Sequence, residues 1–173
     1  FHIGESLLPL NLPLLEKLGV REEIEALAMP KYGVEFNSPR HGRSVTLEFS
    51  QAWDKQFPMA YQVRRSAFDE VLFRNAGRKG ARTHEGVRVR KVEFDDAGAV
   101  AVTRDDQGGN GHWRARFIVD ASGRDTLLAS QFGIKHKNPK HNSAAVFGHF
   151  RGAKRLAGKA DRVLVDAPCS GLG

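Results

Sequence analysis

Apolar residues recur every three or four positions in three stretches of the first half of the chain, which predicts three helices. The first covers residues 11–18, with Pro13 in its first turn and Gly19 as its stop. A second short helix is predicted over residues 21–27. The clearest helix begins at Ser66 and ends at Gly77.

Most of the remaining apolar runs have the length of strands. Residues 31–37 and 44–50 predict a hairpin, in which the alternation of Val45, Leu47 and Phe49 favours one covered face. The end of a later strand, Phe117–Val119, is continuously apolar, as is typical of a buried central strand. The other predicted strands are 61–64, 81–84, 87–94, 99–104, 113–119, 143–151 and 163–165, with a further helix at 126–132. This order predicts an α/β fold that has a mixed sheet and a β-meander.

Composition narrows the class of protein. The chain has 173 residues, of which 40% are hydrophobic and 27% charged, which excludes a disordered or collagen-like chain and a coiled coil. No apolar run approaches the roughly 20 residues that a membrane helix needs. The single cysteine, Cys169, excludes a disulfide framework and a cysteine-built zinc site, and it favours a reducing compartment such as the cytoplasm.

Charge adds less. The net charge of +7 suits either a phosphate-bearing partner or an ordinary solvated surface. The seven histidines are scattered and lack a carboxylate cluster, so no metal site is predicted. The chain begins at Phe1 in mid-pattern and ends in a glycine-rich turn, so we expect a fragment truncated at both ends.

The loop after Phe117–Val119 is the first candidate ligand site. Asp120 and the small residues up to Gly123 follow a predicted buried strand, the position at which open α/β sheets bind ligands. Asp120 can accept a hydrogen bond from a sugar hydroxyl, and backbone N–H groups at the start of the next helix favour anions. The alternative is that Asp120 only caps that helix.

Two other segments carry possible cofactor contacts. Arg65 leads the helix predicted from Ser66, and its guanidinium suits bidentate contact with phosphate. The alternative is an ion pair with Asp69 along the helix. The segment Gly4-Glu5-Ser6 is a small-residue loop before the first helix and says little by itself.

Together these segments resemble a known family. The string from Phe1 to Pro9, the pattern from Tyr61 to Leu72 and the run Val119–Arg124 are similar, in order and separation, to FAD-dependent monooxygenases of the halogenase and geranylgeranyl-reductase-like group. The resemblance implies an FAD cofactor contacted by Gly4, Glu5, Ser6, Arg65, Asp120 and Gly123. It also implies an N-terminal GxGxxG unit, which these residues do not contain.

Lys31 follows from the same resemblance. It lies 27 positions after Gly4, close to where flavin-dependent halogenases have a lysine thought to carry or hydrogen-bond hypohalous acid. A buried amine suits this catalytic role because burial lowers its pKa. The alternative is a surface lysine at the start of a strand.

The tail carries a different resemblance. Residues 161–173, which include Asp166, Pro168 and Cys169, resemble a motif of Sun-type RNA 5-methylcytosine methyltransferases that adjoins S-adenosylmethionine. The second cysteine that this chemistry needs is absent, so the chain cannot run that mechanism alone. We therefore expect two regions, a partial FAD-binding oxidoreductase domain at 1–152 and a strand and loop at 153–173, for which a fusion is one hypothesis.

The leading interpretation is an FAD-dependent oxidoreductase fragment of the halogenase or monooxygenase type. The resemblance implies flavin peroxide chemistry on a small organic substrate, with a separate flavin reductase as a possible partner and no membrane. The alternatives are a fragment of an RNA methyltransferase, with nucleic acid as its partner, or an inactive remnant.

Overall fold

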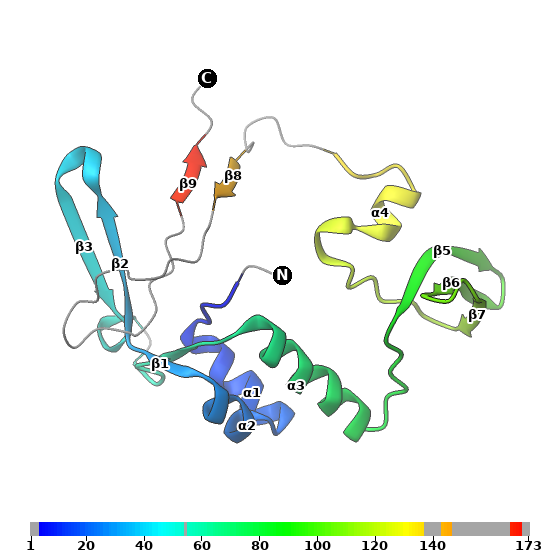
Figure 1. The fold of residues 1–173 in the computed structure, drawn as a ribbon, viewed down its shortest axis with the longest axis horizontal. Coiled ribbons are helices and arrows are strands. Elements are labelled where there is room, and N and C mark those ends of the chain that lie inside the picture. Colours follow the sequence, from blue (N-terminus) through cyan, green and yellow to red (C-terminus); the bar gives the residue numbers. More distant parts are fainter. Residues whose placement is uncertain (1–3, 54, 137–142, 147–166, 171–173) are drawn as a thin grey trace. The chain divides into compact units, whose positions relative to one another are not determined.

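The computed structural model describes residues 4–53, 55–136, 143–146 and 167–170, and these form two units (Figure 1). The first unit comprises the described residues between 4 and 83, and the second comprises those from 84 onward. Each unit has its own helices and strands and is described by itself. Among the described residues, no helix is long and apolar enough to cross a membrane.

The first unit is built on three helices whose apolar faces meet. The helices are α1 (Leu12–Leu18), α2 (Arg21–Leu27) and α3 (Arg65–Arg78), and a 3-10 turn, η1 (Pro9–Asn11), precedes α1. Gly19 adopts the left-handed conformation and ends α1, as predicted. The buried cluster of this unit consists of Leu12, Leu15, Val20, Ile24, Tyr61 and Val63.

A short strand, β4 (Ala60–Gln62), crosses this core and pairs along both of its edges. On one edge it pairs antiparallel with β1 (Met29–Lys31), so that Lys31 lies opposite Ala60. On the other edge Ser6 forms an antiparallel bridge to Gln62. The amide of Leu7 donates to the carbonyl of Tyr61 at 2.9 Å, and that of Val63 donates to Glu5 at 2.7 Å. The Gly4–Leu7 segment is therefore fixed against β4.

The predicted hairpin is present as β2 (Gly33–Ser38) and β3 (Arg43–Glu48), joined by the 3-10 turn η2 (Pro39–His41). The expected covered face is wrong, because Val45 and Leu47 remain more than half exposed. The hairpin has only two strands, and no other described element covers it. Phe49 is buried, but it lies beyond the strand in the 3-10 turn η3 (Phe49–Gln51).

The second unit contains the predicted β-meander. Strands β5 (Val87–Asp95), β6 (Gly98–Asp105) and β7 (Asn110–Ala115) form an antiparallel sheet, with a bulge in β5 between Val89 and Lys91. The 3-10 turn η4 (Gly123–Asp125) and helix α4 (Leu127–Gln131) follow it. The Gln131 side chain holds both the amide and the carbonyl of Val92, at 2.9 and 2.6 Å, which ties α4 to the edge strand β5.

Two strand predictions fail here. Residues 81–84 are irregular, and Phe117–Val119 is neither a strand nor buried, since Phe117 and Val119 are 84% and 88% exposed. A continuously apolar segment becomes a central strand only when strands flank it, and the described residues provide no such partner. The helix-and-strand class and the meander are confirmed.

Two short strands complete the description. Strand β8 (Ser143–Val146) pairs antiparallel with β9 (Ala167–Ser170), which places Cys169 opposite Ala144. The predicted strand 163–165, Asp166 and most of the predicted junction near residue 152 lie outside the described residues.

Candidate functional site

All five predicted site residues of the first unit, Gly4, Glu5, Ser6, Lys31 and Arg65, lie along the Gly4–Leu7 segment or against it. The Lys31 ammonium donates to Ser6 Oγ at 2.5 Å and to the carbonyl of Leu7 at 3.2 Å. Arg65 Nη1 lies 2.9 Å from where a Cβ on Gly4 would be. Gly4, Ser6, Lys31 and Arg65 thus form one cluster, although they span 61 positions of sequence.

Strand pairing explains why Ser6 and Lys31 meet. Residues directly opposite each other in an antiparallel pair point to the same face. Ser6 lies opposite Gln62, and Lys31 lies opposite Ala60. Because side chains alternate along a strand, residues 60 and 62 point to the same face of β4. The Ala60 side chain is small and fully buried, so it leaves room for the Lys31 chain to reach across the strand.

Lys31 is half-buried and has no counter-charge among the described residues. Its Nζ lies 5.0 Å from the centre of the Phe49 ring, and Phe49 is held there by its amide, which donates to the carbonyl of Tyr32 at 2.8 Å. No carboxylate of the described residues forms an ion pair with Lys31. Burial lowers the pKa of the Lys31 ammonium, which increases the fraction of free amine at a given pH.

Arg65 has a fixed position. Its Nε and Nη2 donate to the Asp69 carboxylate at 2.9–3.1 Å within α3, so the helical ion pair that the sequence offered as an alternative is present. Gly4 has φ +108°, a conformation that suits glycine, and this lets the Arg65 guanidinium approach the backbone closely.

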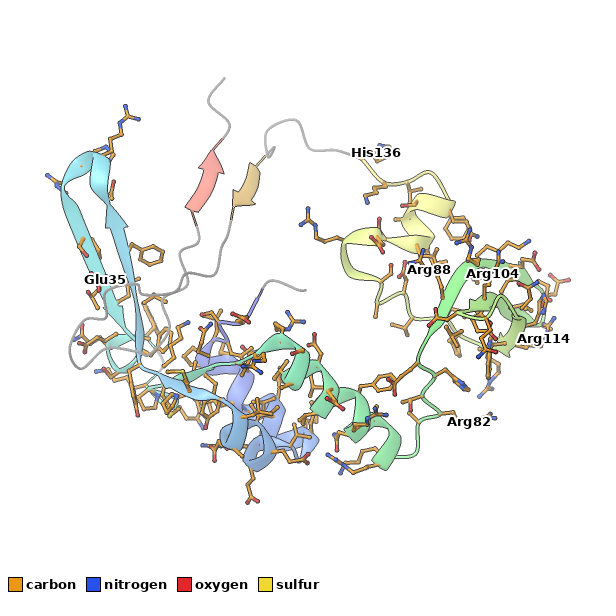
Figure 2. The ribbon with its side chains drawn as sticks, in the orientation of Figure 1. Glu35, Arg82, Arg88, Arg104, Arg114 and His136 are labelled. Carbon is orange, nitrogen blue, oxygen red and sulfur yellow. The ribbon has the colours of Figure 1, made fainter. Side chains whose placement is uncertain are left out.

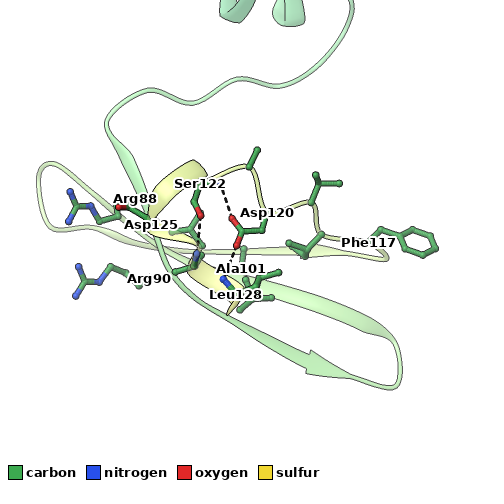
Figure 3. Close-up of a pocket in the computed structure, with 14 residues that line it drawn as sticks. Arg88, Arg90, Ala101, Phe117, Asp120, Ser122, Asp125 and Leu128 are labelled. Atoms are coloured by element: carbon green, nitrogen blue, oxygen red, sulfur yellow. Dashed lines mark hydrogen bonds between the residues drawn. The ribbon is translucent and has the colours of Figure 1, made fainter. Parts of the chain in front are cut away.

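The second unit contains Asp120 and Gly123. One carboxylate oxygen of Asp120 accepts from the amide of Ser122 at 2.9 Å, and the other accepts from the amide of Leu128 at 2.8 Å (Figure 3). The Ser122 hydroxyl accepts from the amide of Leu127 at 2.9 Å. The first amides of α4 are therefore already bonded, which matches the capping alternative. Hydrogen bonds from the Ser122 hydroxyl, and then from the Leu128 and Ser122 amides, lower the pKa of Asp120.

An open cavity of about 700 Å³ lies between β5 and the segment that contains Asp120 (Figure 3). Its lining includes Arg88 and Arg90, neither of which pairs with a described carboxylate, and the backbone of Ala121 and Ser122. Arg88, like Arg104 and Arg114, lies on the meander (Figure 2). Sequence reasoning missed both cavity arginines, although the Val-Arg-Val-Arg run at 87–90 was a visible signal.

Sequence reasoning also missed Phe49 and the Leu7 carbonyl as neighbours of Lys31. Neither has a sequence signal, because one is a backbone group and the other lies in a short turn. The part of the chain that the structure describes contains no group of three metal-ligating side chains.

The chain matches the family model described as FAD binding domain over residues 7–165. It is 33% identical to 1H-pyrrole-2-carbonyl peptidyl-carrier-protein chlorinase of Pseudomonas fluorescens, over 86% of this chain and 37% of that protein. It is 34% identical to tryptophan 2-halogenase of Chondromyces crocatus, over 88% of this chain and 29% of that protein. The chain thus spans about a third of the length of these relatives.

The chain is also similar to solved structures of flavin-dependent proteins. A flavoprotein/dehydrogenase from Cytophaga hutchinsonii aligns with a TM-score of 0.82 and 29% identity, over 91% of this chain and 39% of that one. The myxobacterial chondrochloren halogenase, an FAD-dependent enzyme, aligns with a TM-score of 0.63 and 37% identity, over 72% of this chain and 29% of that one. None of these similarities supports the methyltransferase alternative for the tail.

Proposed function

The chain belongs to the FAD binding domain family, and on that premise we propose that it is the part of an FAD-dependent halogenase that carries its catalytic lysine. One observation carries this proposal. Lys31, chosen by its position after Gly4, is half-buried, lacks a counter-charge among the described residues and is held by hydrogen bonds at its tip.

The described residues fit part of an FAD molecule. FAD presents an anionic pyrophosphate and sugar-like hydroxyls, for which arginines and small-residue backbone are suitable partners. In the first unit Gly4, Glu5, Ser6 and Arg65 are the proposed contacts. In the second unit the proposed contacts are Asp120, Gly123, Arg88 and Arg90. A Cβ built on Gly123 would have no other atom within 4 Å, so the space beside this residue is open. The proposed domain is residues 1–152, although the family match continues to residue 165.

Bound flavin supplies the oxidising chemistry: reduced FAD, oxygen, halide and a proton give oxidised FAD, hypohalous acid and water. The role proposed for this chain is to hold the hypohalous acid at Lys31 Nζ and direct it to the substrate. Replacing a C–H hydrogen of the substrate by the halogen then releases water. The proposed substrate class is a small, electron-rich organic molecule. The proposed source of reduced FAD is a separate flavin reductase, and the proposed location is the cytoplasm.

The test uses a longer protein that contains this chain. The purified protein is supplied with FAD, a flavin reductase, oxygen and bromide, together with tryptophan or with phenol as a trap for hypobromous acid. We expect bound flavin and a brominated product, which the bromine isotope pattern identifies by mass spectrometry. Bound flavin with only hydroxylated or dehydrogenated product would reject the halogenase assignment and leave a flavoprotein of another kind.

A further inference from the structure

The contacts at the tip of Lys31 fix more than the place of its nitrogen. We propose that Ser6, together with the Leu7 carbonyl, is a positioning residue that sets the direction and the proton affinity of the Lys31 amine. This inference rests on the proposed function of Lys31, and it gives the Ser6 hydroxyl a role other than contact with the cofactor.

The geometry of an amine explains the directional part. An ammonium has three N–H donors, whereas a neutral amine has two and one lone pair. The structure provides two acceptors for Nζ, Ser6 Oγ at 2.5 Å and the Leu7 carbonyl at 3.2 Å. Both N–H groups of the neutral amine are therefore used, and the lone pair takes the remaining direction. That lone pair can accept a hydrogen bond from the O–H of hypohalous acid.

The backbone makes this arrangement rigid. The carbonyl of Leu7 cannot turn freely, because the Leu8 amide in the same peptide plane donates to Asn11 Oδ1 at 2.8 Å and the Leu7 amide before it donates to Tyr61 in β4. Tyr61 is buried, and its hydroxyl donates to the Glu25 carboxylate of α2. Lys31 belongs to β1, which pairs with the opposite edge of β4. The acceptors and the amine are thus attached to the same central strand.

The two acceptors also oppose the effect of burial. Burial lowers the pKa of Lys31, whereas hydrogen bonds accepted from an ammonium favour the charged form. Removing the Ser6 hydroxyl takes away one acceptor and leaves the burial unchanged. We therefore expect the pKa of Lys31 to fall further in a variant without this hydroxyl.

The experiment measures acylation of Lys31 as a function of pH in the longer protein with FAD bound. A limiting amount of a succinimidyl ester labels free amines, and peptide mass spectrometry compares Lys31 with the exposed Lys55 in the same sample. The variants are Ser6→Ala and the shape-matched pair Ser6→Thr, which keeps a hydroxyl, and Ser6→Val, which does not. Ser66→Ala, at an exposed serine of α3, is the control. Circular dichroism reports whether each variant is folded.

We expect the acylation midpoint of Lys31 to move to lower pH in Ser6→Ala and Ser6→Val and to stay in place in Ser6→Thr and Ser66→Ala. The amount of brominated product formed per reduced flavin oxidised should fall about 10- to 100-fold in the two variants without a hydroxyl. An unchanged midpoint in both of these variants would overturn the inference. If the midpoint moves but the wild-type protein forms no brominated product, the contact of Ser6 with Lys31 stands and the proposed function fails.

Discussion

Asp120 shows how a single side chain can be committed to structure at a predicted ligand site. Both of its carboxylate oxygens accept backbone amides, and these bonds connect residue 120 to the start of α4. A residue in such a position can still touch a ligand, but its first role is to shape the loop. The same holds for Arg65, whose guanidinium is bonded to Asp69.

The lowered pKa of Asp120 gives a prediction with a definite sign. A carboxylate with a folded-state pKa below its ordinary value of 3.8 stabilises the fold above that value and loses this effect as the pH falls through the lowered pKa. In Asp120→Asn we expect the amides of Ser122 and Leu128 to exchange their hydrogens several-fold faster than in the wild type at pH 7. The two proteins should converge at a pH where Asp120 is protonated.

Hydrogen exchange followed by NMR checks this prediction, with Asp125→Asn in the same loop as the control. Equal exchange rates in wild type and Asp120→Asn at pH 7 would mean that the charge of Asp120 does not stabilise the loop.

At the scale of elements, the helices of the first unit are joined by one buried polar contact. Asn75 of α3 is 5% exposed, and its Nδ2 donates to the carbonyl of Leu18 at 3.1 Å, at the end of α1. The last carbonyls of a helix have no partner within it, so this bond satisfies a group that would otherwise be buried unpaired.

Replacing Asn75 by Ala should therefore lower the free energy of unfolding by about 1–3 kcal/mol. Urea unfolding followed by circular dichroism measures this effect, and Asn110→Ala, at an exposed position of β7, tests whether any asparagine would give the same result. A loss below about 0.5 kcal/mol for Asn75→Ala would show that the contact contributes little.

The elements also show where sequence patterns suffice and where they do not. Helices 12–18 and 21–27 were predictable because local signals, leucine spacing and Gly19, decide them. The exposure of Val45 and of Phe117 was not predictable from the sequence. An apolar pattern indicates that a face can be covered, but it does not indicate which element covers it. The contact of Ser6 with Lys31 depends on β4 lying between them, and that pairing has no sequence signal.

At the scale of the whole molecule, the question is whether the tail, residues 153–173, belongs to the flavin-binding fold. The described part of the tail, β9, pairs with β8, which follows the segments that resemble halogenases. We expect Cys169→Ser to leave FAD binding unchanged, because that cysteine is not among the proposed flavin contacts. Fluorescence titration of FAD into the longer protein measures this. Weaker binding in the variant would make the tail part of the flavin-binding fold and remove the proposed boundary near residue 152.

The central claim is that Lys31 acts in halogen transfer and not in cofactor binding. The most direct test compares wild type and Lys31→Ala in the longer protein, and measures brominated product formed per reduced flavin oxidised, with Lys55→Ala as the control. We predict that Lys31→Ala keeps its FAD and its rate of flavin oxidation but loses brominated product on the order of 100-fold or more, because the residue serves one chemical step. Brominated product from Lys31→Ala at the wild-type rate would contradict this account and leave Lys31 as a structural residue of β1.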